Sequence, residues 1–148
     1  MNGSLAEQLR AALNAARKER DQARTLLFST ILSDVHNREI ELAKPLDDAE
    51  TVEVLRRGIK RRKESVEAFT AGGRQELADR EAGEIAALQP FLPPGASDEE
   101  IRAAVREAVA AGATDLGPLM GRVMPRFKGR ADGQTVGRIA REELAAAS

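Results

Sequence analysis

The sequence predicts an all-α protein with an N-terminal four-helix part and a smaller C-terminal three-helix part. Apolar residues recur at helical spacings of three and four along nearly all of the 148 residues. No segment shows the alternating, β-branched pattern of a strand. Ala, Leu, Glu and Arg are plentiful and the four aromatic residues are all Phe, a composition typical of packed helices.

Helix signals divide the N-terminal part into four segments. We expect helices over residues 4–17, 20–42, 48–71 and 74–89. Ser4 is a suitable N-cap for the first helix, and Asp47 with Glu50 three residues later is the signature of a capping box for the third. Pro45 disfavours helix at the residue before it, and the pair Gly72-Gly73 ends the third helix.

Three prolines within residues 90–94 predict a boundary between two parts of the chain. We expect an N-terminal domain over residues 1–92, a linker over 93–96 and a C-terminal domain over 97–148. The C-terminal domain should hold a helix between the N-cap Ser97 and Gly112, a second over residues 116–127 and a third through residues 136–144.

The turn before the last helix is predicted to be a helix end followed directly by a helix start. Gly129 should end a helix whose last turn carries Arg126 and Lys128, because cations suit the negative end of the helix dipole. Asp132 should cap the next helix by accepting from the backbone amides two to three residues on. Pro125 should bend or loosen the preceding helix.

The charges nearly cancel over the whole chain, but basic and acidic residues are unevenly distributed along the sequence. The formal net charge is −1, so attraction to nucleic acid needs a local patch. Residues 117–148 carry six basic and three acidic side chains (+3), whereas residues 95–116 carry two and five (−3). Such segregation is typical of a phosphate-binding face, although a solvated face is the alternative. The candidate RNA-binding residues are Arg122, Arg126, Lys128, Arg130, Arg138 and Arg141.

A shaped, paired RNA suits this patch better than a single strand. Stacking on bases needs exposed aromatic side chains, and the nearby Phe127 is expected in the core. A second basic run, RRGIKRRK, covers residues 56–63. It is either a solvated face or a secondary face for RNA or an acidic partner, formed by Arg56, Arg57, Lys60 and Arg61.

Arg62 differs from its basic neighbours because it falls inside the apolar stripe of its helix. A guanidinium there must pair with a carboxylate or extend to the edge of the stripe. Glu39 is the predicted partner, on the margin of the apolar arc of the preceding helix, with extension to solvent as the alternative. Arg24 and Arg38 also fall within that arc.

No familiar catalytic or cofactor motif is present. The chain has no Cys and one His, and it lacks a GxSxG nucleophile elbow and the glycine-rich loops that bind nucleotides. We therefore expect no cofactor and no metal. No apolar run approaches the roughly 18 residues of a membrane span, so a soluble cytoplasmic protein with no membrane partner is expected.

Several segments together carry a family resemblance over nearly the whole chain. They are Glu39-Ile40, residues 60–69 (KRRKESVEAF), 71–77 (AGGRQEL), Glu81, 91–93 (FLP), 120–124 (MGRVM) and 128–133 (KGRADG). This pattern resembles the YqeY proteins, which are small, all-α and built in two parts. Their C-terminal part is similar to the tail domain of GatB, the B subunit of the glutamine-dependent aminoacyl-tRNA amidotransferase.

The resemblance implies a tRNA-binding or amidotransferase-associated role. It also implies a label of carbon-nitrogen ligase with glutamine as amido-N-donor, which such proteins inherit from GatB. The GatB tail usually reads Gly-Lys-Ala-Asn-Pro where this chain reads GRADG over residues 129–133. The same type of turn is therefore expected, although several of its residues differ.

Three functional hypotheses follow from the residues and the resemblance. The first is an accessory protein that binds tRNA or another structured RNA, with tRNA-modifying or translation proteins as further partners and no DNA. The second is a protein-interaction module without an RNA role. The third, a stand-alone amide-transferring enzyme, is disfavoured by the missing nucleophile and nucleotide loop.

Overall fold

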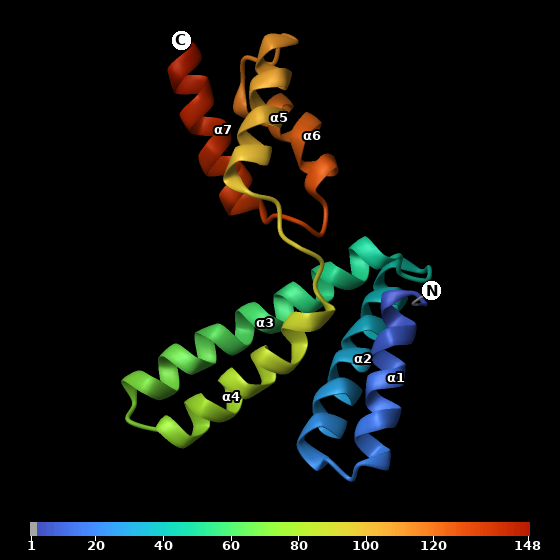
Figure 1. Cartoon of the computed structure of the whole chain (residues 1–148). Coiled ribbons are helices and arrows are strands. Elements are labelled where there is room, and N and C mark those ends of the chain that lie inside the picture. Colours follow the sequence, from blue (N-terminus) through green and yellow to red (C-terminus); the bar gives the residue numbers. More distant parts are fainter. Residues whose placement is uncertain (1–2) are drawn as a thin grey trace. The chain divides into compact units, whose positions relative to one another are not determined.

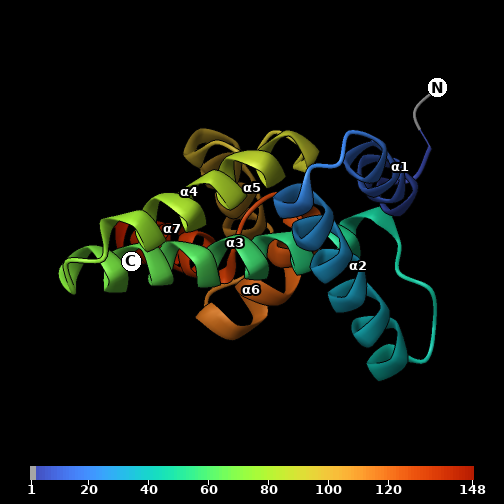
Figure 2. The same ribbon diagram turned by 90° about the horizontal axis from the view of Figure 1, so that it is seen from below.

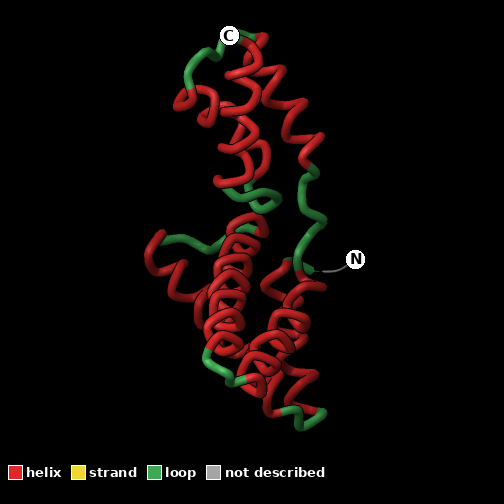
Figure 3. The backbone as a smooth tube through the Cα atoms, turned by 90° about the vertical axis from the view of Figure 1, so that its left-hand side faces the viewer, coloured by secondary structure: helices red, strands yellow, loops and turns green. Residues whose placement is uncertain are grey.

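A computed structural model describes residues 3–148 (Figures 1 and 3). Over this range the chain forms seven α-helices and two short 3-10 helices, with no strand, which confirms the all-α prediction. The chain divides into two compact units: the first ends at Leu92, and the second is Pro93–Ser148.

The N-terminal unit consists of two helical hairpins. Its α-helices are α1 (Leu5–Lys18), α2 (Gln22–Leu42), α3 (Asp48–Ala71) and α4 (Gln75–Leu88), and a 3-10 turn, η1, follows at Gln89–Phe91. Helices α1 and α2 form one antiparallel pair and α3 and α4 the other, as seen from two directions in Figures 1 and 2. The two pairs diverge toward their turns (Figure 1).

Local capping explains where these helices begin. Ser4 Oγ accepts from the amide of Glu7 at 3.2 Å, as predicted. The predicted capping box is also confirmed: Asp47 Oδ1 accepts from the Glu50 amide at 2.8 Å, and Glu50 Oε1 accepts from the Asp47 amide at 3.1 Å. Helix α2 ends at Leu42, because the next residue, Ala43, has a left-handed φ of 55° that breaks the helical path.

The hairpins share one core, and α2 approaches α3 closely at Gly58. A Cβ atom on Gly58 would lie 3.3 Å from Cδ1 of Ile31 and 3.2 Å from Nη1 of Arg62, closer than ordinary packing allows. The absent side chain therefore permits this helix contact. The core around it consists of Leu5, Leu9, Leu13, Leu27, Phe28, Ile31, Val52, Leu55, Ile59 and Leu88.

The C-terminal unit has a separate core. Helix α5 (Asp98–Ala110) packs on α7 (Gly133–Ala147), and α6 (Leu116–Val123) packs on both. A backbone bond from the Ala96 amide to the Arg130 carbonyl, 2.9 Å long, fastens the end of the predicted linker to this unit. The buried apolar residues that form this core are Ile101, Ala104, Val105, Ala113, Leu119, Val123, Phe127, Val136, Ile139 and Ala140.

The turn at Gly129 differs in part from the prediction. Helix α6 ends at Val123, and the chain continues as a 3-10 helix, η2 (Met124–Phe127), so Gly129 does not end an α-helix. The reason is Pro125, which has no amide hydrogen for an α-helical bond, and its predicted loosening effect is confirmed. Gly129 instead reverses the chain with a φ of 78°. Asp132 caps α7 as predicted, accepting from the Thr135 amide at 2.7 Å.

Candidate functional site

The six candidate RNA-binding cations all lie at the surface of the C-terminal unit. Arg130 is half-buried and the other five are exposed. They come from α6, from η2 and the turn after it, and from α7. The fold therefore leaves every one of them in contact with solvent.

Three of these cations form ion pairs with carboxylates of α5. Arg126 pairs with Glu107 at 3.3 Å, and Arg130 pairs with Glu100 at 2.9 Å. Arg138 contacts Asp98 at 3.0 Å and also Glu142, one turn along its own helix, at 3.1 Å. The acidic and basic stretches that are separate in the sequence thus face each other in the fold, because α5 lies beside α7 and beside the η2 segment and turn that precede it.

Two of the cations have no carboxylate within ion-pair distance in the described part of the chain, residues 3–148. These are Arg122 on α6 and Arg141 on α7, and both are exposed. The guanidinium of Arg141 lies over Gly137, where a Cβ atom would be 3.6 Å from its Nη2. Lys128 is exposed as well, in the turn after η2.

The sequence reasoning missed the most buried charge of this unit, Glu143. Its side chain is only 11% exposed and accepts from Arg102 Nη1 at 2.8 Å and from Arg106 Nε at 2.9 Å. Arg102 also reaches Glu142 at 2.8 Å. The signal was present in the spacing, because Glu143 follows the buried Ile139 by four residues on the apolar stripe of α7.

These contacts shift the acid-base equilibria of the groups involved. Hydrogen bonds from Arg106 first and Arg102 second lower the pKa of Glu143 below its ordinary value. Bonds from Arg102 and then Arg138 lower the pKa of Glu142. The bond from Arg130 lowers the pKa of Glu100. All three carboxylates are therefore held in the charged form on which their ion pairs depend.

We expect acid to weaken the C-terminal unit through Glu143. A carboxyl whose pKa is lower folded than unfolded stabilises the fold above the ordinary glutamate value of about 4.3, and this stabilisation disappears as pH falls through the folded value. Urea unfolding from pH 7 to pH 3 should show wild type losing more stability than Glu143→Gln, with the two converging at low pH. Glu99→Gln, at an exposed site, is the control and should follow wild type.

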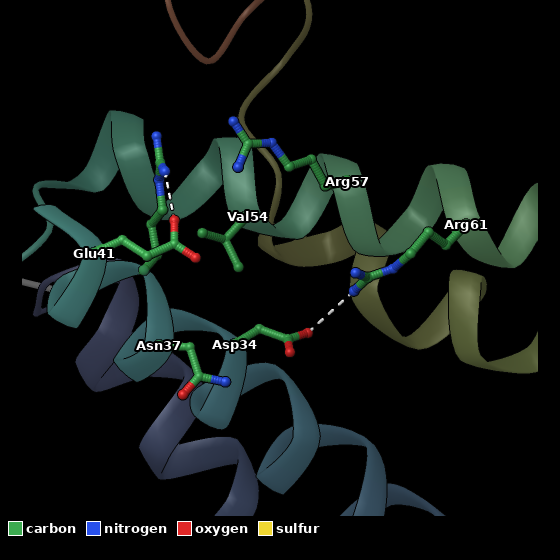
Figure 4. A pocket seen from close by; sticks show the side chains of 7 residues that line it. Asp34, Asn37, Glu41, Val54, Arg57 and Arg61 are labelled. Atoms are coloured by element: carbon green, nitrogen blue, oxygen red, sulfur yellow. Dashed lines mark hydrogen bonds and ion pairs between the residues drawn. The ribbon is translucent and has the colours of Figure 1, made fainter.

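The secondary basic face lies on α3, beside a small cavity of about 230 Å³ between α2 and α3 (Figure 4). Arg61 pairs with Asp34 across it at 3.3 Å. Arg57 also lines the cavity and is exposed. Lys60 and Arg56 do not line it; Lys60 is exposed and Arg56 is half-buried. The remaining lining side chains are Asn37, Arg38, Glu41 and Val54.

The predicted pair between Arg62 and Glu39 is wrong. Arg62 Nε lies 3.3 Å from Glu84 of α4, and its Nη1 donates to the Gly58 carbonyl at 3.0 Å. Glu39 accepts from the Leu46 amide at 3.0 Å. The two residues lie on different helices and at different axial levels: Glu39 is near the end of α2, and Arg62 lies 14 residues, about 21 Å, into α3.

The other two arginines assigned to the apolar arc of α2 both reach the surface. The Arg24 guanidinium lies 5.6 Å from the centroid of the Phe28 ring, a cation-π geometry. Arg38 donates to Glu41 at 2.8 Å. Long side chains thus carry these charges out of the arc, with their stems covering apolar surface.

We expect Arg62 to be energetically coupled to Glu84 and not to Glu39. The Arg62 side chain is 12% exposed, so loss of its partner leaves a largely desolvated charge. In double-mutant cycles, Arg62→Met with Glu84→Gln should give a coupling of about 0.5–3 kcal/mol in unfolding free energy, whereas Arg62→Met with Glu39→Gln should be additive within about 0.5 kcal/mol. Coupling of equal size in both cycles would contradict the pairing.

Two further findings concern site chemistry and the membrane. Within residues 3–148, no three His, Asp or Glu side chains gather in a way that could hold a metal ion. No helix in that range is both long enough and apolar enough to cross a lipid bilayer.

Comparison with known proteins identifies the family. The profile described as "Yqey-like protein" matches residues 6–144. An uncharacterized protein of Schizosaccharomyces pombe is 32% identical over 81 residues, which cover 55% of this chain and 64% of that protein. "Altered inheritance of mitochondria protein 41, mitochondrial" of Kluyveromyces lactis is 33% identical over 100 residues, which cover 66% of this chain and 54% of that protein.

A protein of the same name in Pyrenophora tritici-repentis is 27% identical over 147 residues, which cover 94% of this chain and 80% of that protein. The chain spans between half and two thirds of the length of the first two relatives. The family match, in contrast, extends over both units and almost every helix described above. The chain belongs to the YqeY-like family.

Proposed function

We propose that this chain is a non-catalytic accessory protein of the cytoplasm that binds tRNA, or another structured RNA, through its C-terminal unit, in association with amidotransferase chemistry. The observation that carries the proposal is the set of six surface cations on one small unit. The resemblance of this unit to the GatB tail points to the same class of ligand. A carbon-nitrogen ligase activity would then belong to a partner rather than to this chain.

The ion pairs of the C-terminal unit set the expected strength of binding. Exposed ion pairs are weak, so an RNA phosphate can replace Glu100 or Glu107 beside its arginine. Each replacement forfeits an existing attraction, and the unit as a whole carries as many acidic as basic side chains. We therefore expect modest affinity with a strong dependence on salt.

Filter binding of aminoacylated and free tRNA at several salt concentrations tests the proposal. The logarithm of the affinity should fall linearly with the logarithm of salt concentration, by about 0.7–0.9 per phosphate neutralised. Arg126→Ala/Arg130→Ala should weaken binding and reduce this slope. Glu100→Gln/Glu107→Gln should do the opposite and tighten binding, because it releases the same two arginines.

A matched control is available in the N-terminal unit. Arg10→Ala/Lys18→Ala removes two exposed cations of α1 and should leave both affinity and slope unchanged. Undetectable binding, or binding that does not respond to salt, would refute the proposal. A carboxylate variant that fails to tighten binding would show that Arg126 and Arg130 do not contact the RNA.

A protein-interaction role is the second candidate function. It is favoured by a separate observation in the N-terminal unit, the exposed side chain of Leu26 beside an apolar groove. Complexes that persist after nuclease treatment would support this role and would not require the C-terminal cations.

A further inference from the structure

A groove of about 680 Å³ opens between the N-terminal half of α2 and the helix α4. Its volume falls in the range of about 300–1,000 Å³ that is usual for small-molecule sites, so it can take several side chains of a larger partner. It lies where the two hairpins diverge (Figure 1). The small and apolar side chains that line it are Ala23, Leu26, Leu27, Thr30, Gly83 and Ala87.

Leu26 extends the apolar lining of the groove onto the surface. Its side chain is 70% exposed, although the adjacent Leu27 is only 3% exposed and belongs to the core. A single exposed leucine is ordinary, but this one joins a hollow with an apolar lining and so forms a continuous apolar surface. Burial of this surface against a partner would be favourable.

The side chains that line the groove carry a formal net charge of +1, from Arg24, Arg62 and Arg80 against Asp79 and Glu84. Glu84 pairs with Arg62, whereas Asp79 accepts from the neutral amide of Gln75 at 2.8 Å and keeps its charge. Arg24 and Arg80 line the groove, are exposed, and have no carboxylate within ion-pair distance among residues 3–148. An occupant with carboxylates beside its apolar residues would complement this arrangement.

We propose that the groove between α2 and α4 binds an amphipathic helix of a partner protein, with apolar side chains in the groove and carboxylates facing Arg24 and Arg80. The dimensions agree with this class of ligand. The part of α4 that lines the groove, from Asp79 to Ala87, is about 12 Å long at 1.5 Å per residue. Apolar anchors at positions i, i+4 and i+7 of a docked helix span about 10 Å.

Selection from a phage-displayed library of helical peptides, with the full chain immobilised, tests the proposal without a known partner. Enriched peptides should share apolar residues at i, i+3 or i+4, and i+7, with Asp or Glu beside them. Fluorescence anisotropy then measures their affinity for variants. Leu26→Asn and Arg80→Glu should each weaken binding about tenfold or more, as expected for anchor contacts at the centre of an interface.

Two matched controls and one blocking variant sharpen the test. Ile40→Asn changes the other large exposed aliphatic side chain of α2, which is 65% exposed and outside the groove, and should have little effect. Arg10→Glu changes the net charge by the same amount as Arg80→Glu but lies outside the groove, so it should also have little effect. A Cβ atom at Gly83 meets nothing within 4 Å, so Gly83→Phe can fill the groove without a clash at its first carbon and should block binding.

Three results would overturn the proposal. The first is a selection that enriches no helical peptide, and the second is enriched peptides that bind all groove variants as tightly as wild type. The third is concentration-dependent self-association of the chain that Leu26→Asn abolishes, because the occupant would then be a second copy. Loss of tRNA binding has no bearing on this outcome, since the variants lie in the N-terminal unit.

Discussion

Phe28→Ala is expected to destabilise the N-terminal unit by about 3–5 kcal/mol, the cost of an aromatic-sized cavity in a packed core. Phe28 is fully buried and is the largest side chain at that level of burial. Its ring meets Phe91 edge to face with centroids 5.5 Å apart, and it lies beneath the Arg24 guanidinium. The substitution therefore removes contacts that join α2 to η1 as well as apolar area.

Hydrogen exchange should be measured for individual peptides, because this reports the stability of the two helical units separately. Amides of the N-terminal unit should lose protection, while those of residues 98–147 should not, because the two cores share no residue. Leu26→Ala, two positions away but 70% exposed, is the control and should stay within about 0.5 kcal/mol of wild type. Equal loss of protection in both units would contradict separate cores.

Ile139→Ala is expected to have the complementary effect, destabilising the C-terminal unit by about 2–5 kcal/mol. Ile139 is fully buried on α7, at the centre of a core drawn from α5, α6 and η2. This unit is small, so its total stability is expected to be low and the loss should leave much of it unfolded. Gln134→Ala, exposed in the first turn of the same helix, is the control and should change little.

These two variants also separate the proposed activities. Ile139→Ala should abolish tRNA binding and leave the binding of groove peptides intact, because the candidate cations lie in the unit that it unfolds. Phe28→Ala should do the reverse. If both variants lost both activities, neither proposal could be assigned to its unit.

The starts of α1, α3, α5 and α7 were predictable from the sequence because capping is local. Ser4, Asp47, Ser97 and Asp132 each accept a bond from the amide three residues on. Such bonds depend on a few neighbouring residues and not on tertiary packing. The end of α6 was less predictable, because Pro125 indicates where a helix weakens but not whether the chain continues as a 3-10 helix.

The ion pairs were not predictable to the same degree. Helical periodicity gives the angle of a side chain around its own axis, which correctly separated Arg62 from its neighbours. It gives no axial level relative to another helix, and that level decides that Arg62 meets Glu84 rather than Glu39. The same limit hid the pairing of α5 with α7, which turned two apparently segregated charge stretches into mutual partners.

The close approach of α2 to α3 at Gly58 lies next to the groove between α2 and α4. Ile31 touches α3 at this point, and the groove-lining residues of α2 begin at the next position, Thr30, and continue to Ala23. Leu27 and Phe28 within this stretch are buried in the core, so α2 is held in place beyond the contact as well. A methyl group at Gly58 would instead press on Nη1 of Arg62, and because Arg62 also lines the groove, the substitution would reach the groove through that one side chain.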